Sequence, residues 1–339
     1  MDIPNTPAPD FAFGAFSCSS LYWRHLVEYT GAKESDMDNE GTPTVRKAWY
    51  AGTWYAAEPD VLRSTIDAAI QAAQTVGSQQ DARGPIALAV LPHAGLAYSA
   101  RGLGHLVCNA PKIIKRVVIL SPSHNIVLPD DTLSFGTFSG YDTPLGRLSA
   151  FRTGLETHGP DATNAIQREH AVEMVLPFLA YLQMRQTEPI AVSMALVSHV
   201  TDATHAKRLA ASLVEVLGAE TLERGETLVI ASSDFTHYGH RFGHAPFGAH
   251  VDAAVAAKVR EADLKLATEL ANGELGPVFL TQRMGRSTVC GIAAASIVSA
   301  LGVQLEQSGW VADYYTSLDV LGTKATEFVA YCSILWRLL

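Results

Sequence analysis

Three apolar segments of this chain end in the same way, and this repeated arrangement constrains the fold more than any other feature. Each segment has the length of a buried strand, and polar residues follow each of them at once. AVLPHAG places His93 after the first, VVILSPSH places His124 after the second, and LVIASSDFTHYG places Asp234 and His237 after the third. In open α/β sheets, ligands bind outside the carboxyl ends of the strands. If the three strands are neighbours, these polar residues will line one pocket.

The segments between these strands have the apolar spacing of helices, so strand and helix alternate over most of the chain. The predicted strands cover residues 85–91, 116–120, 190–198, 227–232 and 325–339. The predicted helices cover residues 58–76, 99–110, 169–184, 204–219, 249–273 and 291–303. This alternation is typical of a sheet with helices on both faces. We therefore expect an α/β protein with one domain over residues 45–339.

Residues 1–44 differ from the rest of the chain. They contain Pro4, Pro7 and Pro9, and they carry seven acidic residues against two basic ones. We expect an N-terminal extension that is partly flexible, with an acidic linker near residues 33–44. The segment SSLYWRHLVEYTG within it predicts a short helix that packs on the domain.

Charge and hydropathy exclude several classes of partner. The formal net charge is −9 and no run of Lys and Arg occurs, so the chain lacks the basic face that nucleic acids or anionic membranes require. The longest apolar runs are far shorter than a bilayer-spanning helix, and the N-terminus has no secretory pattern. We expect a cytoplasmic protein without a nucleic-acid or membrane partner. Its four scattered cysteines are then expected to stay reduced.

The residue types after the three strands suit a metal ion. Neutral imidazole and thiolate are good ligands for zinc, copper and iron, and two His plus one anionic group is a recurring set. Cys290 lies in STVCGIAAASIV at the predicted start of a helix, where unpaired N–H groups favour a thiolate. The two histidines His93 and His124 are candidate ligands, and Cys290 is a candidate for the anionic ligand. Asp234 is either a second anionic ligand or an acceptor that orients a His ring.

Simpler interpretations exist for each residue taken alone. A single His after a strand is commonly a hydrogen-bonding loop residue, and a Cys in a helix of small residues is usually buried. Glu169, His170 and Glu173 lie near a predicted helix start, where carboxylates suit the helix dipole. The string of histidines from 237 to 250 has irregular spacing and predicts a solvated loop. The joint pattern, and not any one residue, favours the metal site.

The order of the motifs resembles the Memo family, whose members are related to the class III extradiol ring-cleaving dioxygenases. The motifs are RKAWYAGTWY, PHAG, SPSH, TPLG, EHAVEMVLPF, SSDFTHYGHRF, TVCG and YYTSLDV, and together they cover Arg46 to about Tyr331. Departures from the family occur beside the motifs. Leu96 replaces a Tyr, Ala100 and Ser121 replace Gly residues, and Ile292 stands where some relatives have Arg. None of these is a predicted ligand.

This resemblance implies a single α/β domain with a central mixed sheet and a pocket at one end. It implies that His93, His124 and Cys290 are the metal ligands, with Cys290 where the dioxygenases have a Glu. Asp234 and His237 match the other polar residues of the pocket, and His237 corresponds to the acid/base His of the dioxygenases. Copper or iron is the implied metal, with zinc as a further candidate, and the implied chemistry is redox chemistry.

Three functions follow from these residues. The first is a mononuclear copper or iron oxidoreductase in which a small molecule or O₂ reacts at open coordination positions while His237 and Asp234 handle protons. The second is a non-catalytic module that binds a protein partner or peptide in the same pocket. The third is a metal-free hydrolase with Cys290 as the nucleophile and His237 or His93 as the base. A thiolate in place of a carboxylate argues against ring cleavage by the extradiol route.

Overall fold

Strands and helices alternate along the computed structural model, which describes residues 44–77, 84–321 and 325–338. The strands are β1 (Val45–Arg46), β2 (Ile86–Leu91), β3 (Arg116–Ser121), β4 (Ser134–Phe135), β5 (Gly140–Thr143), β6 (Gly146–Ala150), β7 (Ala191–Leu196), β8 (Thr227–Ser232), β9 (His237–Tyr238), β10 (Gly309–Thr316) and β11 (Phe328–Arg337). The helices are α1 (Pro59–Gly77), α2 (Leu96–Cys108), α3 (Thr163–Gln167), α4 (Leu176–Gln183), α5 (Ala203–Leu217), α6 (Ala219–Glu223), the 3-10 helix η2 (His240–Phe242), α7 (Ala253–Ala271), α8 (Leu275–Arg283), α9 (Ile292–Gln304) and α10 (Ser317–Leu321). The predicted extension and its short helix lie outside the described residues.

All eleven described strands belong to one mixed sheet, with the order β1-β5-β6-β7-β3-β8-β2-β11-β10. In addition, β4 pairs with β7 and β9 pairs with β11. Strands β7, β3, β8 and β2 run parallel, whereas β11 is antiparallel to both β2 and β10. The prediction of an α/β fold with a central mixed sheet is therefore confirmed.

The three strands with polar ends are neighbours in this sheet. β8 lies between β3 and β2 and is parallel to both, with Ala231 opposite Leu120 on one side and Val90 on the other. Parallel neighbours end at the same edge of a sheet. The residues that follow β2, β3 and β8 therefore gather at one edge, as the sequence requires for a shared pocket.

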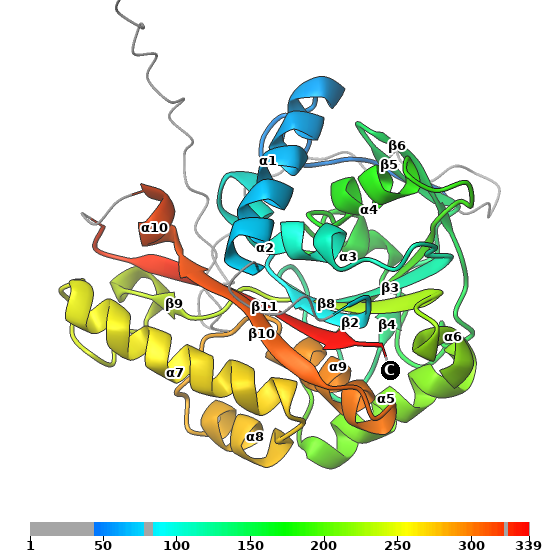
Figure 1. The fold of residues 1–339 in the computed structure, drawn as a ribbon. Coiled ribbons are helices and arrows are strands. Elements are labelled where there is room, and N and C mark those ends of the chain that lie inside the picture. Colours follow the sequence, from blue (N-terminus) through cyan, green and yellow to red (C-terminus); the bar gives the residue numbers. More distant parts are fainter. Residues whose placement is uncertain (1–43, 78–83, 322–324, 339) are drawn as a thin grey trace, which may run out of the picture.

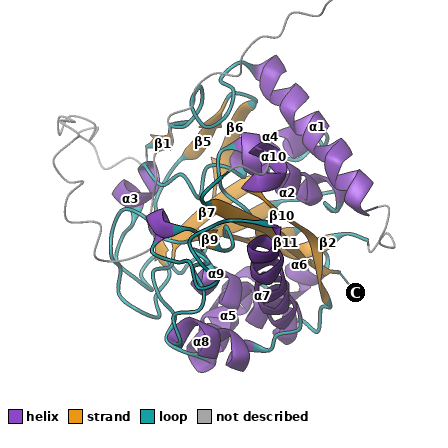
Figure 2. Ribbon diagram, turned by 90° about the vertical axis from the view of Figure 1, so that its left-hand side faces the viewer, coloured by secondary structure: helices purple, strands orange, loops and turns teal. Residues whose placement is uncertain are grey.

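Helices cover both faces of the sheet and create two apolar cores. Figures 1 and 2 show α1, α2 and α4 on one side, and α5, α8 and α9 on the other. Along β3, Val117 and Ile119 belong to the first core while Val118 and Leu120 belong to the second. Because successive side chains of a strand point to opposite faces, a continuous apolar run supplies both cores. The central strands are therefore rigid supports for the residues at their ends.

The helix predicted over residues 169–184 is wrong in its first half, because α4 begins only at Leu176 and residues 171–175 form turns. The buried carboxylates of Glu169 and Glu173 accept hydrogen bonds from distant parts of the chain. These tertiary hydrogen bonds override the helical spacing of the segment. The sequence also gave no indication of the short strands β4, β5 and β6, or of β10.

Two further findings bear on the sequence predictions. No helix in the described ranges is both long and apolar enough to span a membrane. Cys108, Cys290 and Cys332 carry thiols and form no disulfide, while Cys18 lies in the segment that the structure does not describe. Of these thiols, Cys332 is buried in the core and Cys290 lies at the sheet edge described above.

Candidate metal centre

Three imidazoles meet at the carboxyl edge of the sheet. His93 follows β2, His124 follows β3, and His170 lies in the turn that precedes α4. One ligand nitrogen from each lies within 4.8 Å of the others, and the rings of His124 and His170 stack with 4.5 Å between their centroids. His93 and His170 are buried and His124 is nearly so. This arrangement has the donors and the compactness of a single-ion site.

The hydrogen bonds of His93 identify the ring nitrogen that is available to a ligand. Its Nδ1 lies 2.9 Å from Ser232 Oγ, and that hydroxyl donates its own hydrogen to the carbonyl of Ala171 at 2.6 Å. Ser232 Oγ can therefore only accept from His93, so we assign the ring hydrogen to Nδ1. The lone pair is then on Nε2, which lies beside Cys290 Sγ.

Glu169 orients the other two rings through one oxygen atom. Its Oε1 lies 2.8 Å from His124 Nδ1 and 3.2 Å from His170 Nδ1. Its Oε2 accepts the backbone N–H of His124 at 2.8 Å. Burial by itself would raise the pKa of Glu169, but His124 and its hydrogen bonds lower that pKa to about 2. The ionised carboxylate thus accepts the Nδ1–H of His124, whose Nε2 remains for an ion, and it lies close to the ring of His170.

Burial also sets the charge of the rings. It lowers the pKa of His93 and of His170 well below the ordinary value, and the neighbouring His124 lowers both further. Both rings are therefore neutral at physiological pH. Neutral imidazole is the form that binds a metal ion, so these two rings need to lose no proton when an ion enters.

The sulfur of Cys290 lies against one ring of the cluster. Its Sγ is 3.2 Å from His93 Nε2 and accepts the backbone N–H of Asp234 at 3.3 Å. Cys290 directly precedes Gly291 and α9, as the sequence predicts. The three mutually close ligand atoms are all imidazole nitrogens and do not include this sulfur. The ligand role of Cys290 stays a prediction that its position beside His93 permits.

Gly291 allows α9 to approach the end of β8. A Cβ at this position would collide with the carbonyl oxygen of Ser232 and would lie 2.6 Å from Ser233 Cβ. The backbone N–H of Gly291 donates to Ser233 Oγ at 3.1 Å. The close packing therefore requires glycine at position 291, and it brings the thiol of Cys290 next to His93.

We expect Gly291→Ala to lower the free energy of unfolding by about 1–3 kcal/mol, because the added methyl overpacks a rigid strand end. Thermal denaturation measures this effect. Gly276→Ala is the matched control, because a Cβ at Gly276 in α8 meets nothing within 4 Å. Equal melting temperatures for the two variants would contradict the close approach.

Asp234 and His237, the predicted catalytic residues, lie in the segment after β8. Asp234 Oδ1 accepts the backbone N–H of His93 at 2.8 Å, and burial raises the pKa of Asp234 to about 7 against the lowering effect of such N–H groups. His237 Nδ1 lies 3.0 Å from the Phe235 carbonyl oxygen and 3.1 Å from that of Thr288. Burial lowers the pKa of His237 to about 4, although these hydrogen bonds oppose it. His237 is therefore neutral, with Nε2 able to accept a proton.

Comparison with known sequences decides the family. The sequence profile of the family described as Memo-like protein matches residues 46–335. The chain belongs to the Memo-like family. It is 30% identical to a MEMO1 family protein of Methanopyrus kandleri over 305 residues, which cover 85% of this chain and 97% of the relative. It is also similar to Protein MEMO1 of Xenopus laevis, with 28% identity over 78% of this chain and 86% of the relative. Protein MEMO1 of Homo sapiens is 25% identical over the same shares.

Within this Memo-like fold, a buried ion pair holds the turn that carries His170. Arg46 is fully buried, and its Nη1 lies 2.6 Å from Glu173 Oε2. The same guanidinium donates to the carbonyl oxygens of Glu169 at 3.0 Å and Ile166 at 2.9 Å. Arg46 therefore links the first described strand to the residues on both sides of His170.

The other oxygen of Glu173 holds an aromatic wall over His170. Glu173 Oε1 accepts the N–H of Tyr50 at 2.8 Å and the hydroxyl of Tyr55 at 2.7 Å. The turn between these tyrosines places Trp54 against His170, with 4.6 Å between ring centroids. Gly52 makes that turn with φ +83°, a left-handed conformation that favours glycine. The motif WYAGTWY thus covers one side of the centre.

His170 and Glu169 were missed as site residues by the reasoning from sequence. They were assigned to the start of a predicted helix, whereas they lie in the turns before it. The sequence does contain an indication that Glu169 and His170 belong to the site, because both lie in EHAVEMVLPF, one of the motifs that carry the family resemblance.

Proposed function

We propose that this protein is a metal-dependent oxidoreductase with a single copper or iron ion held by His93, His124 and His170, with Cys290 as a fourth donor. The observation that carries the proposal is the convergence of three imidazoles, two of which have their Nδ1 atoms held by hydrogen bonds to Ser232 and Glu169. Fixed tautomers with Nε2 directed inward are typical of ligands and unnecessary for structural histidines.

The donor set supports the choice of metal. Imidazole and thiolate donors suit copper, iron and zinc, whereas magnesium and calcium prefer oxygen ligands. A thiolate makes the site softer, which favours copper among these candidates. A copper or iron ion bound here would supply one-electron chemistry toward O₂ or a small-molecule substrate.

The remaining pocket residues are suited to proton transfer. Burial lowers the pKa of His237 to about 4, so the ring is neutral at physiological pH, and its Nδ1 lies 3.0 Å from a carbonyl oxygen, which leaves Nε2 to accept a proton once a bound substrate or ion changes that environment. Asp234, whose pKa is raised by burial to about 7, can hold or release a proton in the same range. We assign His237 the role of general base and Asp234 the role of a neighbouring proton carrier.

Metal content tests the proposal directly. We expect protein purified without added metal, and analysed by elemental mass spectrometry, to hold about one equivalent of copper or iron. His93→Ala, His124→Ala and His170→Ala should each lose most of it, since each removes one of three donors. His199→Ala is the control, because His199 lies on the surface beside Asp130. Full metal content in all three variants would refute the assignment of the site.

Redox function needs its own measurement. We expect oxygen uptake in the presence of a reductant by the loaded protein, and loss of this uptake in the three ligand variants. His237→Gln should keep the metal, because His237 is outside the cluster of ligand atoms, yet lower the rate. A loaded protein that neither consumes oxygen nor changes its oxidation state would leave metal binding intact and remove the oxidoreductase assignment.

A second candidate is favoured by the 3.2 Å separation of Cys290 Sγ and His93 Nε2. A thiol next to an imidazole that is itself oriented by Ser232 has the arrangement of a nucleophile and its base. The protein would then be a thiol hydrolase that needs no metal. Rapid labelling of Cys290 by iodoacetamide, with hydrolysis of ester substrates unaffected by chelators, would favour this candidate over the first.

A further inference from the structure

A cavity of about 600 Å³ lies next to the candidate metal centre and is separate from it. It is lined by α7, the start of the loop after α8 and the loop after η2, and none of His93, His124, His170 and Cys290 lines it. Thr236 and Ser287, which directly precede His237 and Thr288, form part of its wall. Cavities of this size commonly hold small organic molecules.

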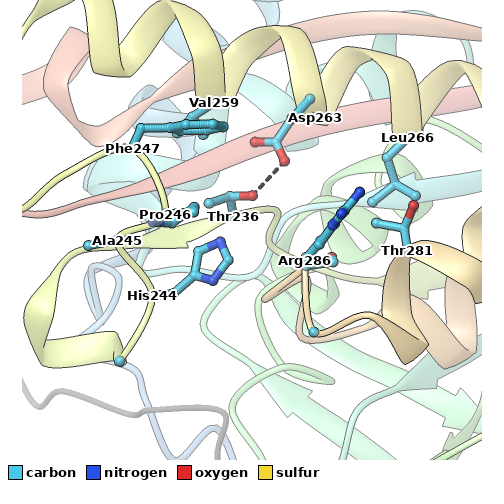
Figure 3. Close-up of a pocket in the computed structure, with 14 residues that line it drawn as sticks. Thr236, His244, Ala245, Pro246, Phe247, Val259, Asp263, Leu266, Thr281 and Arg286 are labelled. Carbon is cyan, nitrogen blue, oxygen red and sulfur yellow. Dashed lines mark hydrogen bonds between the residues drawn. The ribbon is translucent and has the colours of Figure 1, made fainter.

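The cavity has an apolar wall and a small number of polar groups. Pro246, Phe247, Val259 and Leu266 supply the apolar surface. The polar side chains include His244, Asp263 and Arg286, and Figure 3 shows His244 and Arg286 on opposite sides of the space below Asp263. An apolar lining with few polar groups is typical of sites that fix the orientation of a mostly apolar ligand.

Arg286 is the cation of this cavity; it is a solvent-exposed residue at the cavity's edge and has no anionic partner among the described residues. Across the described parts of the chain, no ion pair within 4.0 Å and no side-chain hydrogen bond involves its guanidinium. Figure 3 shows this side chain extending along the cavity beside Leu266 and Thr281. An Arg without a partner is well suited to a carboxylate or phosphate, because its planar donors match both groups.

Asp263 limits how much negative charge the cavity can accept. Its carboxylate accepts the hydroxyl hydrogens of Thr236 at 2.6 Å and Tyr314 at 2.9 Å. Burial raises the pKa of Asp263 to about 6 against these hydrogen bonds, so the group is mostly ionised at neutral pH. Burial lowers the pKa of His244, so that ring adds little positive charge at neutral pH. The Asp263 carboxylate is already bound by two hydroxyl groups, and Arg286 is the one guanidinium among the described lining residues, which matches a single carboxylate better than a doubly charged phosphate.

We propose that this cavity binds a small organic monocarboxylate, with its carboxylate on Arg286 and its apolar body against Phe247, Val259 and Leu266. The site is independent of the metal proposal, because it shares no residue with the cluster of ligand atoms. The ligand belongs to the class of aryl or alkyl carboxylic acids of a size that 600 Å³ can hold.

Binding of phenylacetate, followed by ligand-observed NMR on the full chain, tests the proposal. We expect millimolar binding that Arg286→Gln weakens roughly tenfold or more through loss of a charge-assisted hydrogen bond. Arg283→Gln is the matched control, because Arg283 is an exposed arginine at the end of α8 that does not line the cavity. Ala262→Trp places a large side chain at the exposed rim and should abolish binding without changing the core.

Three results would overturn this site. Wild-type protein could fail to bind phenylacetate at millimolar concentration, or Arg286→Gln could bind it as well as wild type does. Phenylacetamide or benzylphosphonate could bind as tightly as phenylacetate, which would remove the preference for a single negative charge. Because every readout is binding, neither a positive nor a negative result depends on the metal or on oxidoreductase activity.

Discussion

Arg46→Met is expected to lower the free energy of unfolding by roughly 3–5 kcal/mol, because it leaves the charge of Glu173 buried without its partner. Both side chains are fully buried, and Nη1 and Oε2 lie 2.6 Å apart. The substitution also removes the donors to the carbonyl oxygens of Ile166 and Glu169. Chemical denaturation monitored by fluorescence and circular dichroism measures the loss.

Arg147→Met is the matched control for this experiment. Arg147 pairs with Asp142 at 2.7 Å, but its side chain is 57% exposed, so the pair should contribute no more than about 1 kcal/mol. The double variant Arg46→Met with Glu173→Gln should recover part of the loss, since it removes the uncompensated charge while the two carbonyls stay without their donor. A single variant as stable as the control would show that the buried pair does not hold the turn.

The second large effect is expected on metal affinity, which Glu169→Gln should lower by about 10–100-fold. An amide presents one acceptor oxygen and no charge, whereas Oε1 of Glu169 now faces the Nδ1 atoms of both His124 and His170. His124 would lose the carboxylate that fixes its tautomer, and His170 would lose a neighbouring charge. Competition with a chromophoric chelator measures the affinity for copper and for zinc.

Glu156→Gln is the control for the affinity measurement. Glu156 also accepts backbone hydrogen bonds, from Thr153 at 2.6 Å and Gly154, but it does so away from the cluster. Elemental analysis of the same samples separates a change in affinity from a loss of folded protein. An unchanged affinity in Glu169→Gln would mean that the carboxylate does not orient the rings.

The fold was largely predictable because its central strands are local features of the sequence. Buried runs such as VVIL are read directly, and each polar residue that follows marks a strand end. The order of the strands was not predictable, since β8 enters between β3 and β2 through contacts between residues more than one hundred positions apart. Only that order turns the separate motifs of His93 and His124 into neighbours.

The candidate site was partly predictable for the same reason. His93 and His124 are visible as residues after strands, but His170 is in a segment whose spacing predicts a helix. Its position depends on Glu173 and Arg46, which are 127 positions apart in the chain. A contact between such distant residues leaves no trace in local periodicity. The cavity with Arg286 is likewise formed by segments that meet only in the folded chain.

The position of β8 has a consequence for the biogenesis of the centre. His93 and His124 emerge early in synthesis, but the strands that carry them are separated in the sheet by β8, which ends at Ser232. Until β8 is synthesised and pairs with both β2 and β3, nothing in the sheet holds His93 and His124 near each other. Loading during translation would therefore have to wait until the chain has been made through Ser232, about two thirds of the 339 residues. A product that ends before β8 would lack the strand that brings His93 and His124 together.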